Sequence, residues 1–172
     1  FSMMGGDSAD LPLMRIAAAG HDVVQNRGSG VNEEESITIV AQLMRDSNQF
    51  SEEDITRVSD AIRATIVQFT GGTVVQVNLN AQSPALTRAL AFADLGVAGF
   101  EGADTYLREG DRLFFELSNN HDMQHLDVAS LTIAQKNAYK ARMVSWLTGQ
   151  VAFVQGRESR FEGELEGLGS EQ

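Results

Sequence analysis

A histidine and an aspartate lie side by side at His21-Asp22, directly after the small, apolar run Ile16–Gly20. An imidazole and a carboxylate are common ligands of divalent metal ions. Burying an ionised carboxylate without such a partner is very unfavourable. The pair therefore indicates a bound cation as the first hypothesis for this site.

A second carboxylate, Asp94, also lies in an apolar setting, within Ala91–Gly96. Another His-Asp pair, His121-Asp122, lies among polar residues together with His125, where water can satisfy all three side chains. His21, Asp22 and Asp94 are therefore the polar residues whose apolar settings need an explanation. Structural roles are the alternative: a core histidine bonded to a backbone carbonyl, an aspartate that caps the next turn, and an interhelical cap or ion pair for Asp94.

The composition excludes several classes of function. The chain has 172 residues and no cysteine, which leaves histidine and carboxylate side chains as candidate metal ligands. Its 24 acidic and 13 basic residues give a formal charge of −11, which disfavours nucleic acid as a partner. No apolar run approaches the ~20 residues of a membrane span, so we expect no membrane partner and a cytoplasmic protein.

Hydrophobic periodicity predicts the helices that must position these residues. A short helix begins near Pro12 and ends at the His-Asp pair, and its own residues are apolar on nearly every side. Ile37, Val40, Ala41 and Met44 form the buried stripe of a second helix. A third begins at Ser51, and its apolar positions are Ile55, Val58, Ile62, Ile66 and Phe69, up to Gly71-Gly72.

The second half of the chain continues this helical pattern. Thr73–Val77 is β-branched but lacks an evident partner strand, so we interpret it as an extended connector. Helices follow from Ser83-Pro84 through Val97, from Asp104 to Leu117 with Leu107 and Phe114 inward, and from a capping box at Thr132 and Gln135. We therefore expect a single all-α domain over residues 1–172, with flexible ends at 1–10 and 162–172.

The order of these features resembles the HD-domain superfamily of metal-dependent phosphohydrolases. Ala-Ala-Gly-His21-Asp22 is similar to the central His-Asp doublet of that family, and Asp94 to its closing aspartate. The resemblance implies a helical bundle of the HD type. It also implies one divalent cation, Mn, Mg, Fe, Co or Ni, on His21, Asp22 and Asp94. The first histidine of the family pattern has no counterpart before His21, so either the chain begins after that helix or the site has three protein ligands.

The same resemblance suggests which residues would act on a substrate. Asp22 and Glu33 are the catalytic candidates, because Gln25 stands where nucleotidase-like members have a proton-transferring glutamate. Arg108 and Arg112 lie one helical turn apart and could bind an anionic substrate, although neighbouring acids also fit a solvated ion-pair face.

The expected function is hydrolysis of a small phosphorylated metabolite or nucleotide. One alternative is a degenerate HD domain that binds a ligand or partner without turnover. A further alternative is an HD-type iron oxygenase. Assembly into a homo-oligomer is left open by the sequence.

Overall fold

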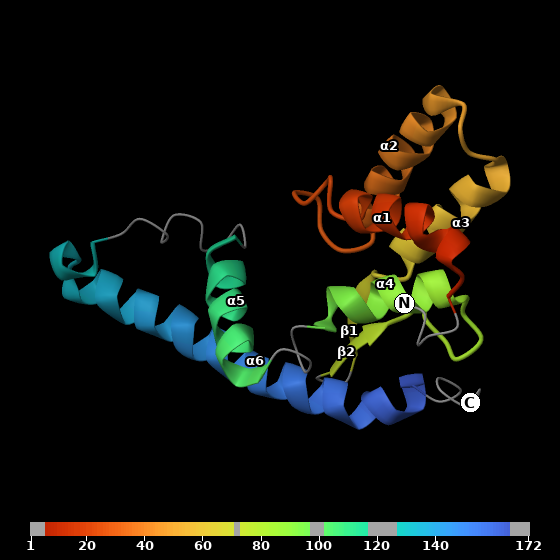
Figure 1. The fold of residues 1–172 in the computed structure, drawn as a ribbon. Coiled ribbons are helices and arrows are strands. Elements are labelled where there is room, and N and C mark those ends of the chain that lie inside the picture. The colour runs from red at the N-terminus through yellow and green to blue at the C-terminus, as the bar shows by residue number, and fades with distance from the viewer. Residues whose placement is uncertain (1–5, 71–72, 97–101, 117–126, 166–172) are drawn as a thin grey trace. The chain divides into compact units, whose positions relative to one another are not determined.

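The computed structural model of the chain describes residues 6–70, 73–96, 102–116 and 127–165. This part is mostly helical, as predicted, with one small sheet (Figure 1). The elements in chain order are η2 (Ser8–Asp10), α1 (Leu11–Gly20), α2 (Val31–Ser47), α3 (Glu52–Arg63), β1 (Val67–Thr70), β2 (Thr73–Gln76), α4 (Ala85–Asp94), α5 (Gly102–Glu116), η5 (Val128–Ser130) and α6 (Ile133–Leu165).

The chain divides into two compact units. One comprises residues 1–95 with 160–172, and the other comprises residues 96–159. The three candidate metal ligands belong to the first unit, whereas Arg108 and Arg112 belong to the second.

A capping box marks the start of α3, and helical spacing determines which side chains of the first unit are buried. Ser51 Oγ accepts a hydrogen bond from Asp54 N at 3.1 Å, and Asp54 Oδ2 accepts one from Ser51 N at 3.0 Å, which forms a capping box. The predicted start of α3 is therefore confirmed. The predicted apolar positions of α2, and those of α3 as far as Ile62, are also confirmed, since the buried core of this unit comprises Leu13, Ala17, Ile37, Val40, Ala41, Met44, Ile55, Val58, Ala61, Ile62, Leu86 and Leu90.

A β-hairpin replaces the end of the predicted third helix. α3 ends at Arg63, and β1 pairs antiparallel with β2, so that Val67 lies opposite Gln76 and Thr70 opposite Thr73. The interpretation of Thr73–Val77 as an unpaired connector is therefore wrong. The physical reason is that the β-branched residues of both segments favour strand over helix, and the two strands can pair with each other.

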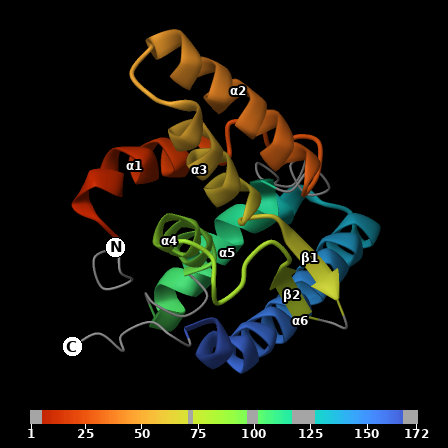
Figure 2. The same cartoon turned by 90° about the vertical axis from the view of Figure 1, so that its right-hand side faces the viewer.

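α4 packs on α3, as Figure 2 shows, and places Asp94 at its own carboxyl end. The Gln76 amide Nε2 of β2 donates a hydrogen bond to Ala91 O at 2.7 Å. Leu86 and Leu90 are buried, as their spacing predicts. Since α4 ends at Asp94, this carboxylate projects from the helix terminus.

The second unit is built on the contact between α5 and α6. Phe114 is 1% exposed, and its ring lies 5.9 Å from that of Trp146. Leu107, predicted to point inward, is instead 56% exposed. The predicted capping box at the start of α6 is confirmed, with Thr132 N donating to Gln135 Oε1 at 3.0 Å.

Helical structure extends into the two segments near the ends of the chain. Residues 8–10 form the 3-10 helix η2, and α6 remains helical to Leu165, beyond the start of the segment 162–172. Residues 1–5 and 166–172 lie outside the described residues. In the described part of the chain, every helix is too short or too polar to cross a membrane.

Candidate metal centre

His21 is held in place by the carboxyl end of α1. Its backbone N–H donates to Ala17 O at 2.9 Å, and its ring nitrogen Nδ1 lies 2.9 Å from Ala18 O. A backbone carbonyl accepts only from a protonated nitrogen, so Nδ1 carries a proton. The other nitrogen, Nε2, is therefore the ring atom that faces the rest of the site.

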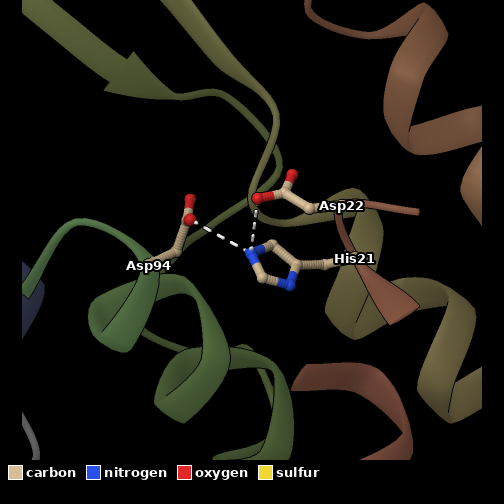
Figure 3. Close-up of side chains that lie close together, drawn as sticks. All are labelled: His21, Asp22 and Asp94. Carbon is tan, nitrogen blue, oxygen red and sulfur yellow. Dashed lines mark ion pairs between the residues drawn. The ribbon is translucent and has the colours of Figure 1, made fainter. Parts of the chain in front are cut away.

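Both aspartates face that same nitrogen. His21 Nε2 lies 3.3 Å from Asp22 Oδ2 and 3.4 Å from Asp94 Oδ1, as the dashed lines in Figure 3 show. One donor atom from each residue lies within 4.8 Å of the other two. The structure therefore brings together the three residues that the sequence predicts as ligands, from the end of α1 and the end of α4.

The surroundings make this cluster strongly negative. α1 and α4 both end at the site, and a helix carboxyl terminus carries a partial negative charge that adds to the two carboxylates. The side chains of His21 and Asp94 are 19% and 24% exposed, whereas that of Asp22 is 54% exposed. A cation would thus be shielded on one side and reachable from water beside Asp22.

The same charges act on the imidazole. The hydrogen bond to Asp94 raises the pKa of His21 from 6.5 to about 9, although burial opposes the shift; the charge of Asp22 and the Ala18 carbonyl raise it further. The imidazole is therefore protonated at neutral pH, and its second proton occupies the position between the carboxylates that a metal ion would take.

We expect the metal-free chain to lose stability as the pH rises above neutrality. Because the folded pKa of about 9 lies above the ordinary 6.5, the stabilisation is complete below pH 6.5 and disappears as the pH rises through 9. Its size is on the order of 1–2 kcal/mol, since water screens part of the interaction at Asp22. Urea unfolding in EDTA at several pH values should show this loss in the native chain, and a His21→Gln variant should lack it. If the unfolding free energies of the two chains depended on pH in the same way, His21 would not be the cause of the loss.

Two residues that were not predicted from the sequence to belong to the site hold residues 20–24 against α2. Ser36, 0% exposed on α2, accepts a hydrogen bond through Oγ from Val24 N at 3.1 Å. At Gly20, an added Cβ would lie 2.4 Å from Val40 Cγ2. A serine directly before the apolar stripe of α2 is the signal that could have identified Ser36.

The other sequence candidates have partners of their own. Glu33 accepts a hydrogen bond from Gly30 N at 2.6 Å and so takes part in the capping of α2. Arg108 and Arg112 pair with Glu109 at 3.2 Å and 3.0 Å on α5, which agrees with the alternative of a solvated ion-pair face. His121, Asp122 and His125 lie outside the described residues.

Comparison of the chain with family models, with curated proteins and with solved structures gives no match. The resemblance to the HD-domain superfamily therefore depends on the residues of the chain itself.

Proposed function

We propose that the chain is a metal-dependent phosphohydrolase of the HD-domain type that acts on a small phosphorylated metabolite or nucleotide. The observation that carries this proposal is the convergence of His21 Nε2, Asp22 Oδ2 and Asp94 Oδ1, from two segments far apart in the sequence, within 4.8 Å of one another.

The donor set fits a divalent cation. One imidazole nitrogen and two carboxylate oxygens suit Mn, Fe, Co or Ni, and the carboxylates also suit Mg. Three protein ligands leave coordination positions for water and substrate. A divalent cation bound there would polarise a phosphoryl oxygen and stabilise the negative charge that develops during hydrolysis.

The protein residues would orient the ligands and supply the proton transfers. The carbonyl of Ala18 fixes the imidazole so that Nε2 faces both aspartates. Asp22, the most exposed of the three ligands, is the carboxylate that an incoming substrate would meet first. Glu33 would have to release Gly30 N before its carboxylate could accept a proton elsewhere. Arg108 and Arg112 stay candidates for binding the anionic group of the substrate.

A second candidate is a domain that binds a metal and a ligand without turnover. The capping role of Glu33 favours it, because the nearest candidate for proton transfer is already engaged. Gln25, which cannot transfer a proton, agrees with this alternative.

A hydrolysis screen separates the two candidates. We expect the native chain, supplied with each of the five metals in turn, to release phosphate from p-nitrophenyl phosphate or from a panel of nucleoside monophosphates. Asp94→Asn should lower this rate on the order of 100-fold or more, since it weakens a ligand that touches the metal. Asp46→Asn is the matched control, because among the described residues the side-chain partner of this exposed carboxylate on α2 is Gln42. Metal binding without phosphate release from any substrate would favour the non-catalytic candidate.

A further inference from the structure

One side of α6 exposes a row of apolar side chains. Ile133, Val144, Leu147 and Val151 are 79%, 53%, 47% and 58% exposed. They belong to a series of residues spaced three or four apart, which places them on one face of a helix. We call this series the outer stripe; it consists of Ile133, Lys136, Lys140, Val144, Leu147, Val151, Val154 and Glu158.

The outer stripe is not the side of α6 that packs on α5 in the second unit (Figure 1). The Trp146 ring lies 5.9 Å from that of Phe114, and the Tyr106 hydroxyl donates a hydrogen bond to Gln150 Oε1. At 3.6 residues per turn, Trp146 and Gln150 lie roughly 100° around the helix from the residues that follow them in the outer stripe. The second unit therefore uses one face of α6 for its own core and leaves another exposed.

The charges at the two ends of the outer stripe are opposite. Lys136 and Lys140 lie toward its amino end, Glu158 lies at its carboxyl end, and all three are exposed. Lys136 comes 11 residues before Leu147, and Glu158 comes 11 residues after it. An antiparallel second copy of α6, with Leu147 at the two-fold axis, would therefore place Lys136 of each copy opposite Glu158 of the other. A parallel copy would place like charges opposite each other.

The apolar residues fit the same antiparallel register. Leu147 would pack on Leu147 of the second copy, and Val144 would lie beside Val151. Lys140 comes 7 residues before Leu147 and Val154 comes 7 residues after it, so the aliphatic part of the lysine side chain would cover the valine. The stripe extends over more than three heptads, a length typical of two-stranded coiled coils.

We propose that the outer stripe of α6 is the interface of an antiparallel homodimer, centred on Leu147, in which Lys136 of each copy pairs with Glu158 of the other. Charges and apolar residues that match about a single centre are the property of an interface between identical chains. An anionic membrane surface fits less well, because it would repel Glu158. The proposal does not depend on the metal centre or on the hydrolase activity.

Sedimentation velocity of the full chain at low salt tests the interface. We expect a monomer–dimer equilibrium that shifts toward the dimer as the protein concentration rises. Leu147→Lys should raise the dissociation constant by roughly 100-fold or more, because it places two cations at the centre of the interface. Leu113→Lys is the matched control, since Leu113 on α5 is also 47% exposed and lies outside the stripe. This variant should associate as the native chain does.

A charge exchange tests the register. Lys136→Glu and Glu158→Lys should each raise the dissociation constant by roughly tenfold at low salt, because each turns two attractive pairs into two repulsive ones. The double variant Lys136→Glu/Glu158→Lys restores opposite charges across the interface and should recover the native dissociation constant. Circular dichroism of each variant should match that of the native chain, since all the changed side chains are exposed.

Three results would overturn the proposal. A chain that stays monomeric at every concentration has no such interface, and if such a monomer bound phosphatidylserine vesicles, the outer stripe would be a membrane-binding surface instead. A dimer that Leu147→Lys leaves intact would be formed by another part of the chain. A double charge variant that remains as weak as the single ones would contradict the antiparallel register.

Discussion

Replacing Asp94 with asparagine is expected to abolish stoichiometric binding of a divalent cation. Asp94 supplies one of the three donor atoms and is the better shielded of the two carboxylates, at 24% exposure against 54% for Asp22. Loss of its charge should weaken binding by roughly 100-fold or more. Isothermal titration of the native chain with Mn²⁺ or Co²⁺ should give one site per chain, and the Asp94→Asn titration should show none at the same concentrations.

Matched variants make this result specific. His21→Gln should behave like Asp94→Asn, whereas Asp22→Asn should lose less affinity, because water can replace its exposed carboxylate more easily. Asp46→Asn should bind as the native chain does. A native chain with no bound cation, or an Asp94→Asn variant with unchanged affinity, would refute the metal centre.

The second large effect is expected at Gly20. An alanine there would place Cβ 2.4 Å from Val40 Cγ2, and Val40 is only 5% exposed and has a stiff β-branched side chain. The overpacked contact should cost about 1–3 kcal/mol of unfolding free energy. It should also shift His21, the next residue, so urea unfolding and cation titration should both detect the change.

Two controls separate this clash from general effects of helix propensity. Gly149 on α6 has nothing within 4 Å of an added Cβ, so Gly149→Ala should stabilise the chain by roughly 0.5–1 kcal/mol. Val40→Ala in the Gly20→Ala background should recover part of the loss, because it removes the methyl group that clashes. A Gly20→Ala variant as stable as the native chain would show that α1 and α2 can move apart at this point.

Local sequence signals were sufficient for the start and the buried face of α3, and they singled out His21 and Asp94 as unusual polar residues. Ser51 and Asp54 give a capping signal that depends on a few neighbouring residues, and the buried Ile55, Val58 and Ile62 follow from helical spacing. His21 and Asp94 were recognisable because polar residues in apolar runs need a partner. Their meeting depends on tertiary packing, which the resemblance to HD domains implied and the periodicity did not.

Features that depend on distant contacts were not predictable in the same way. Ile66 and Phe69 continue the spacing of α3, yet β1 begins at Val67, because strand pairing with β2 competes with helix propagation. The hydrogen bond from Val24 N to Ser36 Oγ and the contact of Gly20 with Val40 join α1 and its following loop to α2. Neither contact leaves a periodic signal in the sequence.

The placement of His21 and Asp94 at the ends of α1 and α4 also has a kinetic consequence. The two residues are separated by α2, α3 and the hairpin, so their contact closes a long loop, and we expect it to form late in folding. Interactions that form after the transition state change the unfolding rate more than the folding rate. We therefore expect the ion pair between them to act mainly by slowing the unfolding of the first unit.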